Sequence, residues 1–341
     1  MIYDVFNGDA DGLCALHQLR LAKPAESELV TGVKRDISLL KRMNAKAGDE
    51  IILPGFAFMG AANVAIQMGI KPVFAEVNSD TWCLDPSSLD SLITPKTKAI
   101  IPIHTYGNVC RTDEIKEIAD TNNLLVIEDC AESLFSKYKG QQSGKIGAIS
   151  TYSFQATKTI TTGEGGLVVT DSDEIADIMM LYRSHGMRRK DKHYWHEIPG
   201  HNFRLTNFQA AMGVAQLETK DLICSERQRV YNKYKELLSN VEGLDFQVYE
   251  EEVTPVVWAV AMILNEDAFG NSRDEVMALL KEKNIETRPG FFSPEFMELY
   301  ESPHLPVSAG LTRNVLSLPS FPSLTDAEIE YICEQLIALK S

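Results

Sequence analysis

Long apolar runs, a surplus of positive charge and paired cysteines are all missing from this sequence of 341 residues. No apolar run approaches the roughly 20 residues that a membrane-spanning helix needs, and no signal peptide precedes the first polar residues. The formal net charge of −15 argues against nucleic acid or an anionic membrane as the main partner, because both attract a basic face. The six cysteines have neither paired spacing nor a metal-ligand motif, which favours reduced thiols. We therefore expect a cytoplasmic protein.

From about residue 50, short apolar runs alternate with helical patterns, and this order predicts an α/β fold. Runs with the character of strands cover residues 51–53, 72–77, 99–103, 124–127 and 165–170. A helical pattern at 112–120 lies between two of them. We expect a mostly parallel central sheet with helices on both faces.

Capping-box signals, in which Ser, Thr or Asp precedes Glu by three residues, predict the starts of three later helices. They occur at Asp171 with Glu174, at Ser272 with Glu275 and at Thr325 with Glu328. The first of these helices is expected to end near Ser184. Long helical patterns also cover 209–217 and 226–239, and one clear strand covers 256–264.

These patterns divide the chain into three expected parts. A large domain covers 49–225, and a smaller α+β domain covers 226–341, linked to it by the long helix. Residues 1–48 form an atypical N-terminal segment, because the alternation of strand-like and helical segments begins only at about residue 50.

Lys158 lies in a Gly- and Thr-rich turn, residues 152–166, between two runs of β type. An amine held in such a turn can form a Schiff base with an aldehyde cofactor. Asp129 ends the apolar run that begins at Leu124, and an acid there can face a protonated pyridine nitrogen. The two residues together indicate an enzyme that uses pyridoxal 5'-phosphate (PLP).

Residues 49–341 resemble the DegT/DnrJ/StrS sugar aminotransferases, which are PLP enzymes of fold type I. The matching stretches are 48–54, 97–104, 126–133, 152–166, 200–204, 209–211, 285–289 and 316–319. The resemblance implies a transaminase that moves an amino group, from glutamate, to a nucleotide-linked keto-sugar in amino-sugar and surface polysaccharide biosynthesis. It also implies a homodimer with shared active sites.

The resemblance assigns two catalytic residues. Lys158 would hold PLP and move the reacting proton as base and acid, and Asp129 would stabilise the protonated ring nitrogen. A lysine at this position also separates the chain from related dehydratases, which carry histidine there. A solvated surface lysine and a helix-capping aspartate are the structural alternatives.

Four further residues are assigned to the cofactor by the same resemblance. Glu132 would lie near the cofactor's 3-oxygen, Ser153 would donate to its phosphate, and Phe58 would stack on its ring. Asn202 would reach across the dimer to the phosphate bound by the partner. Structural uses of Ser153 in a strand and of Phe58 in the core remain open.

Three residues lie in segments that line the sugar site of the resembling enzymes: Tyr106, Arg204 and Arg288. Arg204 could instead support the loop around Asn202. Arg288 could equally be a surface arginine.

The first residues depart from the family, which begins with a helix and a phosphate-binding turn that has no counterpart here. Instead, Asp9 and Asp11 resemble the first metal-binding motif of the DHH phosphoesterases, whose carboxylates hold divalent ions such as manganese. The downstream ligands of that family are missing from the sequence, so we expect no metal. Residues 12–16 are a candidate replacement for the missing turn.

The sequence supports three hypotheses. The first is an active sugar aminotransferase. The second is a PLP-fold protein with impaired or no catalysis, because the N-terminal phosphate-binding turn is replaced. The third, a metal-dependent phosphoesterase, rests on Asp9 and Asp11 alone.

Overall fold

The computed structural model describes residues 3–7, 28–32, 46–188 and 192–340. Asp9, Asp11 and residues 12–16 lie outside these ranges. Within the N-terminal segment, β1 (Tyr3–Asn7) and β2 (Glu28–Gly32) pair in parallel as a two-stranded sheet. Across the part of the chain that the structure describes, no helix is long and apolar enough to cross a membrane.

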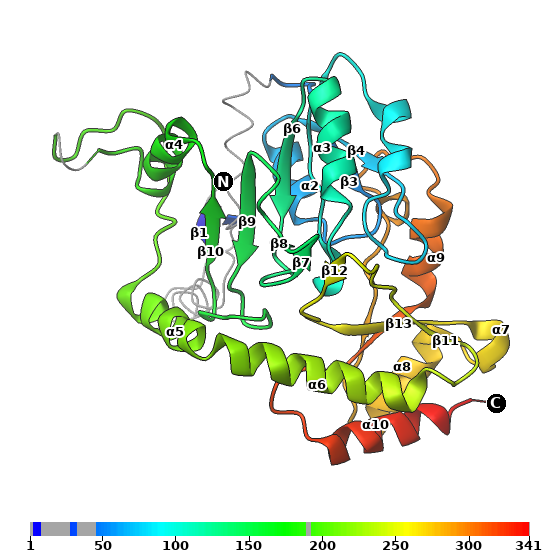
Figure 1. The fold of residues 1–341 in the computed structure, drawn as a ribbon. Helices are drawn as coiled ribbons and strands as arrows, with labels where there is room; N and C mark the ends of the chain where they lie inside the picture. Colours follow the sequence, from blue (N-terminus) through cyan, green and yellow to red (C-terminus); the bar gives the residue numbers. More distant parts are fainter. Residues whose placement is uncertain (1–2, 8–27, 33–45, 189–191, 341) are drawn as a thin grey trace.

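A six-stranded sheet forms the larger body of the molecule (Figure 1), in the order β10-β9-β6-β5-β3-β4. Its strands are β3 (Glu50–Pro54), β4 (Lys71–Ala75), β5 (Thr97–Ile100), β6 (Leu125–Asp129), β9 (Ile149–Ser153) and β10 (Gly166–Val169). Neighbouring strands are parallel except that β10 runs antiparallel to β9. The expected α/β fold with a mostly parallel sheet is therefore confirmed.

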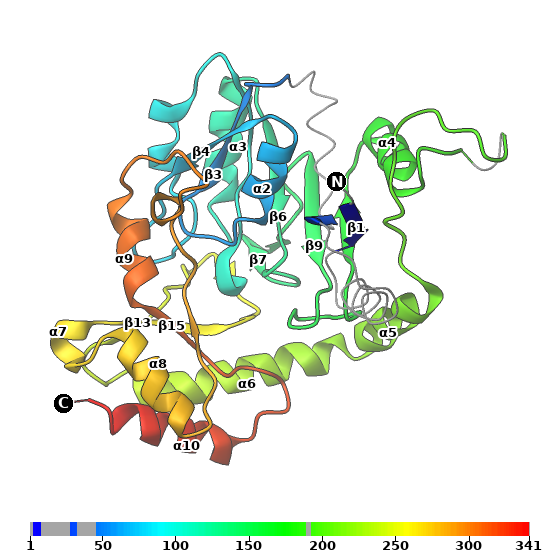
Figure 2. The same cartoon turned by 180° about the vertical axis from the view of Figure 1, so that it is seen from behind.

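The two faces of this sheet carry separate cores because side chains alternate along each strand. Ile51 and Leu53 of β3 pack with helix α2 (Gly60–Gln67), whereas Ile52 packs with helix α3 (Thr112–Thr121). Figures 1 and 2 show α3 and α2 from their respective sides. The sheet is thus covered by helices on both faces, and its central strands β3, β5 and β6 are mostly buried, as parallel strands require.

A second, four-stranded antiparallel sheet lies toward the C-terminus, in the order β11-β13-β15-β14. Its strands are β11 (Leu244–Phe246), β13 (Val260–Leu264), β14 (Arg288–Pro289) and β15 (Val315–Leu318). Its core packs against α6 (Lys220–Leu238), α8 (Arg273–Glu282) and α10 (Asp326–Ile337). The domain boundary expected after residue 225 falls inside α6.

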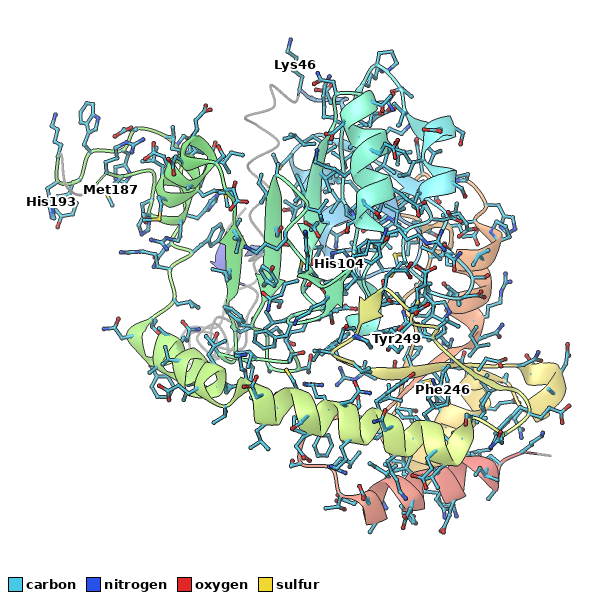
Figure 3. The ribbon with its side chains drawn as sticks, viewed as in Figure 1. Lys46, His104, Met187, His193, Phe246 and Tyr249 are labelled. Atoms are coloured by element: carbon cyan, nitrogen blue, oxygen red, sulfur yellow. The ribbon has the colours of Figure 1, made fainter. Side chains whose placement is uncertain are left out.

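The remaining described strands and α-helices lie outside these two sheets. A small three-stranded sheet contains β12 (Val253–Thr254), β7 (Lys137–Tyr138) and β8 (Gln141–Gln142). The other helices are α4 (Asp173–Arg183), α5 (Asn207–Glu218), α7 (Glu266–Phe269) and α9 (Pro306–Asn314). The loop after α4 projects from the body and carries Met187 and His193 at its outer end (Figure 3).

Two of the three predicted capping boxes are confirmed. In α8 the Ser272 hydroxyl and the Glu275 carboxylate cap each other's backbone N–H groups, and Thr325 does the same with Glu328 in α10. The predicted box at Asp171 is wrong. The hydroxyl of Ser172 accepts the Ile175 N–H instead, so α4 begins one residue later than the box implied.

Two other predicted elements change their extent. The predicted strand 256–264 begins only at Val260, because the residues before it bond to loops of the larger body. The Val256 N–H donates to the Ser136 hydroxyl at 2.9 Å, and the Trp258 N–H donates to the Tyr106 carbonyl at 3.2 Å. Helix α6 begins at Lys220, earlier than the predicted residue 226.

Candidate active site

A cleft of about 1780 Å³ opens where the parallel strands β6 and β9 end. The carboxyl ends of parallel strands are where open α/β sheets bind ligands. The cleft is also lined by β14 and the end of β15, so both sheets contribute to it. All nine candidate residues line this one cleft: Phe58, Tyr106, Asp129, Glu132, Ser153, Lys158, Asn202, Arg204 and Arg288.

Asp129 is the last residue of β6 and is buried. Its backbone is fixed on both sides, since its N–H donates to the Pro102 carbonyl at 2.9 Å and its carbonyl accepts the His104 N–H at 3.1 Å. Its carboxylate accepts the N–H of Ala131 at 3.0 Å. The strand end therefore delivers a buried, oriented carboxylate to the cleft.

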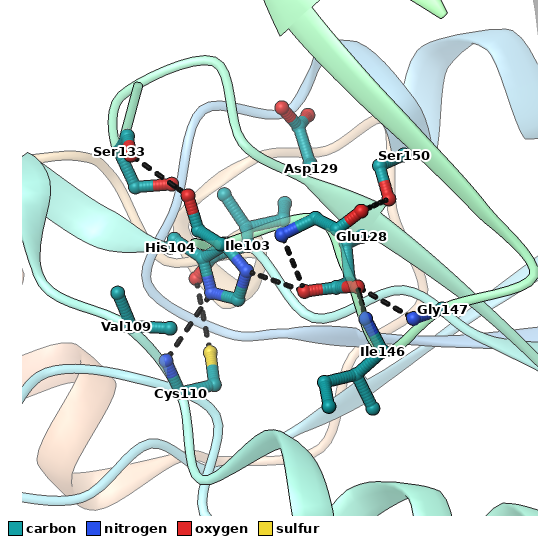
Figure 4. Close-up of polar contacts among 12 residues, drawn as sticks. Ile103, His104, Val109, Cys110, Glu128, Asp129, Ser133, Ile146, Gly147 and Ser150 are labelled. Atoms are coloured by element: carbon teal, nitrogen blue, oxygen red, sulfur yellow. Dashed lines mark hydrogen bonds and ion pairs between the residues drawn. The ribbon is translucent and has the colours of Figure 1, made fainter. Parts of the chain in front are cut away.

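Behind Asp129 lies a buried pair, His104 and Glu128, that fixes this strand end (Figure 4). The Cys110 N–H donates to His104 Nδ1 at 3.2 Å, so Nε2 carries the proton that reaches Glu128 Oε2 at 3.2 Å. The carboxylate of Glu128 also accepts the backbone N–H groups of Gly144, Ile146 and Gly147. Burial acts to raise the pKa of Glu128, but the His104 contact and these N–H groups bring it below its ordinary value.

The same corner brings His104, Glu128 and Cys130 together, with one ligand-type atom of each within 4.8 Å of the others. The hydrogen bonds above already use His104 Nδ1, His104 Nε2 and both oxygens of Glu128. Burial and the neighbouring charges of Glu128 and Asp129 also raise the pKa of the Cys130 thiol, which disfavours the thiolate that binds metals. This cluster is therefore a hydrogen-bonded support for β6.

Lys158 lies on the turn that follows β9, with its N–H donated to the Gln155 carbonyl at 2.9 Å. Its side chain is only 9% exposed. The ammonium Nζ lies 3.6 Å from Glu132 Oε1 and 3.6 Å from the centroid of the Trp258 ring. The amine is therefore enclosed in the cleft between a carboxylate and an aromatic face, unlike a solvated surface lysine.

Glu132 connects Lys158 to a strained backbone position. Its other oxygen, Oε2, accepts the N–H of Tyr106 at 2.9 Å. Tyr106 has φ of 59°, in the left-handed region that a bulky residue rarely adopts, and such strain persists only where neighbours hold it. Glu132 supplies one such contact while facing the amine.

The ring of Tyr106 is sandwiched between two other rings. It stacks on Trp258 with centroids 6.1 Å apart and on Phe291 with centroids 5.1 Å apart. Burial, followed by the charge of Glu132, raises the pKa of the phenol, which stays neutral. Because the side chain is buried, Tyr106 presents little surface to a ligand and mainly supports the rings around it.

Phe58 and Ser153 both line the wall of the cleft. Phe58 is 54% exposed and meets Phe291 edge to face at 6.5 Å. The Ser153 hydroxyl, at the end of β9, accepts the Gln155 N–H at 3.3 Å. The core alternative for Phe58 does not fit its exposure.

Asn202, Arg204 and Arg288 lie at the more open parts of the cleft. Arg204 Nε donates to Asn202 Oδ1 at 3.2 Å, so this arginine orients the asparagine of its own loop. Arg288 on β14 is 66% exposed and lies 3.7 Å from Glu286. These three residues are placed to meet a large, polar ligand from outside.

The described residues fit PLP chemistry. The enclosed Lys158 amine matches the aldehyde, buried Asp129 matches the pyridine nitrogen, exposed Phe58 matches the ring face, and Ser153 offers a hydroxyl. Four complementary groups therefore converge on one cleft.

Among the cleft residues that were not predicted from the sequence, Trp258 and Arg227 contact Lys158 or its turn. Trp258 contacts the lysine directly, and Arg227 on α6 donates to the carbonyls of Trp258 and Lys158 at 2.9 and 3.4 Å. In the sequence, Trp258 is only a tryptophan near the start of the apolar run 256–264. A buried strand has the same pattern, so the sequence did not indicate a role in the cleft.

Comparison with known proteins agrees with this geometry. The profile of the DegT/DnrJ/EryC1/StrS aminotransferase family matches residues 36–337, and so begins before the residue 49 expected from the sequence. A GDP-perosamine synthase of Escherichia coli O157:H7 is 38% identical over 301 residues, which cover 87% of this chain and 80% of that relative. A GDP-perosamine synthase of Caulobacter vibrioides is also 38% identical, over 87% of this chain and 81% of its own length.

A solved structure of DesI, determined in the presence of its TDP-sugar product, superposes with a TM-score of 0.80 at 28% identity. That match covers 89% of this chain and 77% of DesI. The family match, over residues 36–337, includes all strands of the six-stranded and four-stranded sheets and the residues that line the cleft. The chain therefore belongs to the DegT/DnrJ/EryC1/StrS aminotransferase family, whose enzymes depend on PLP.

Proposed function

We propose that this enzyme transfers an amino group from glutamate to a nucleotide-linked keto-sugar in the biosynthesis of an amino-sugar for a surface polysaccharide. The observation that carries the proposal is the enclosed Lys158 amine, in one cleft with buried Asp129. The similarity to two GDP-perosamine synthases and to a TDP-sugar enzyme supports a sugar nucleotide as the substrate.

The residues of the cleft have distinct roles in this proposal. When bound, PLP supplies an electron sink for the carbon that loses its proton. Lys158 would hold the cofactor through Nζ and, once the amino donor has displaced it, its free amine would take up that proton and return it. Asp129 keeps a proton on the ring nitrogen, and Glu132 holds the amine in place through its contact at 3.6 Å. Both carboxylates are buried, where a charge acts more strongly than in water.

The remaining residues bind and orient. Phe58 lies against the ring face, and the Ser153 hydroxyl binds the cofactor phosphate. Arg204 and Arg288 face the anionic sugar nucleotide, since guanidinium groups match phosphate oxygens. Tyr106 supports the substrate wall through its stacked ring.

We propose a homodimer in which Asn202 reaches the partner's cofactor phosphate. Asn202 is exposed in the single chain. The neighbouring helix α5 exposes large apolar side chains, including Phe208, Val214 and Leu217, and we expect the partner to cover some of them. The free cysteines of the described ranges and the acidic composition support a cytoplasmic location.

The second candidate function is a PLP-fold protein with impaired or no catalysis. It is favoured by the sequence, in which the family's N-terminal phosphate-binding turn is replaced. Each lost charge-assisted hydrogen bond to a phosphate would weaken cofactor binding by about 1.5–3 kcal/mol.

Amino transfer is tested with glutamate labelled with ¹⁵N and a panel of keto-sugars linked to GDP or TDP, with mass spectrometry of the products. We expect label in an amino-sugar nucleotide with the wild-type protein and none with Lys158→Ala. No label in any product would count against amino transfer, and failure of a folded dimer to retain PLP would select the second function.

A further inference from the structure

Trp258 forms one wall of the space that holds the Lys158 ammonium. Nζ lies 3.6 Å from the ring centroid, well inside the range of about 6 Å over which an aromatic face attracts a cation. The carboxylate of Glu132 is on another side at 3.6 Å. The lysine therefore has a defined resting position within the cleft.

The position of Trp258 is itself fixed from several directions. Its indole Nε1–H donates to the Thr157 carbonyl at 2.7 Å, directly before Lys158 in the chain. Its backbone N–H donates to the Tyr106 carbonyl, and its ring stacks on the Tyr106 ring at an interplanar angle of 21°. A single residue between β12 and β13 thus bonds to the lysine turn and to the loop after β5.

Arg227 on α6 completes this arrangement. It is 6% exposed, and it donates to the Trp258 carbonyl at 2.9 Å and to the Lys158 carbonyl at 3.4 Å. Burial lowers the pKa of Arg227 to about 10, and within the described ranges it forms no ion pair with a carboxylate. Burying a cation without a carboxylate partner is costly. The two hydrogen bonds to backbone carbonyls therefore offset part of the cost of burying Arg227.

We propose that Arg227 and Trp258 are positioning residues that hold the Lys158 turn, and its ammonium, at the site of proton transfer. Arg227 links the backbones of Trp258 and Lys158 to α6 through its two hydrogen bonds. Trp258 covers the amine and donates a hydrogen bond to the Thr157 carbonyl. The proposal rests on the proposed role of Lys158. Reacting groups must be placed closely, because a displacement of about 1 Å can reduce a rate by about a hundredfold.

The test compares Trp258→Leu and Arg227→Met with a control, Arg229→Lys. Arg229 lies on the same helix, pairs with Glu226 at 2.8 Å and does not line the cleft. In the cofactor-free full chain, the rate at which trinitrobenzenesulfonate labels Lys158 is measured by peptide mass spectrometry. In the PLP-loaded enzyme, kcat and KM for the sugar nucleotide are measured.

We expect both variants to be labelled about fivefold faster or more, because the amine loses its cover and its fixed place. We expect kcat to fall about tenfold or more, with KM changed less than about threefold. Trp258→Phe keeps an aromatic face and Arg227→Lys keeps the charge, so both should lie between the wild type and the stronger variants. If Trp258→Leu or Arg227→Met does not fold, the labelling rate and kcat of Trp258→Phe or Arg227→Lys, respectively, test the proposal instead.

Labelling rates and kcat values equal to those of Arg229→Lys would overturn the proposal. A wild-type protein that fails to retain PLP would instead contradict the proposed function. The labelling comparison uses cofactor-free protein, so it still tests the positioning role in that case.

Discussion

Two buried glutamates, Glu128 and Glu132, stand on either side of Asp129 in the sequence and differ in what surrounds them. Glu128 accepts hydrogen bonds from His104 and from three backbone N–H groups behind the sheet. Glu132 accepts the Tyr106 N–H and faces the Lys158 amine in the cleft. Burial alone therefore does not identify a functional acid. The partners do, because fixed backbone donors indicate support and a facing amine indicates chemistry.

The largest expected effect comes from substituting Asp129, which lies between Glu128 and Glu132 in the sequence. We expect Asp129→Asn to lower kcat by about a hundredfold or more, because the ring nitrogen loses its counter-charge. The amide oxygen can still accept the Ala131 N–H, so unfolding free energy should change by less than about 1 kcal/mol. Steady-state kinetics and urea unfolding measure both quantities. A kcat within threefold of the wild type would remove Asp129 from the catalytic pair.

Glu128→Gln tests the supporting role. The substitution replaces one carboxylate oxygen by an NH₂ group, which cannot accept the N–H groups that this oxygen accepts. We therefore expect a loss of about 2–4 kcal/mol in unfolding free energy. The kcat of the folded fraction should change little. Denaturant unfolding followed by circular dichroism measures the loss, and an unchanged midpoint would contradict a supporting role.

The effect of Glu128→Gln should also depend on pH. The pKa of Glu128 is below its ordinary value in the folded protein, because the contacts from His104 and backbone N–H groups outweigh burial. Its stabilisation is therefore complete above the unfolded-state value of about 4.3 and is lost as the pH falls further. The stability difference between wild type and variant should narrow below about pH 4.

Glu132→Gln is the matched change on the cleft side. The amide oxygen can still accept the Tyr106 N–H, but the charge facing Lys158 is lost. We expect kcat to fall about tenfold and unfolding free energy to change by less than about 1 kcal/mol. If stability fell as far as in Glu128→Gln, the contrast between the two glutamates would fail.

Arg288→Ala should have the smallest effect, because its side chain is 66% exposed. An exposed ion pair contributes about 1 kcal/mol at most, so KM for the sugar nucleotide should rise about threefold with kcat unchanged. Initial rates over a range of sugar-nucleotide concentrations measure KM and kcat. No change in KM would favour the surface-arginine alternative.

The sequence was sufficient for residues that belong to local patterns. Asp129 ends a strand-like run, Lys158 lies in the turn between two such runs, and the capping boxes at Ser272 and Thr325 depend on residues three apart. These features are decided within one turn or one strand. The mostly parallel sheet likewise results from the order of its elements.

Features that depend on distant contacts were not predictable in the same way. Strand β13 begins only at Val260 because Val256 and Trp258 bond instead to Ser136 and Tyr106. These partners are more than a hundred positions away in the chain. The same bonds place Trp258 over the lysine. The cap of α4 illustrates a local limit, since Asp171 and Ser172 are both good capping residues and the sequence does not choose between them.

The central claim, that Lys158 is the PLP lysine of this cleft, is tested most directly by visible absorbance. The purified full chain is incubated with PLP and desalted, beside a Lys158→Ala variant of equal circular dichroism. We predict a visible absorption band that is retained by the wild type and absent from the variant. A folded wild-type protein without the band, or a band that survives in Lys158→Ala, would contradict the claim.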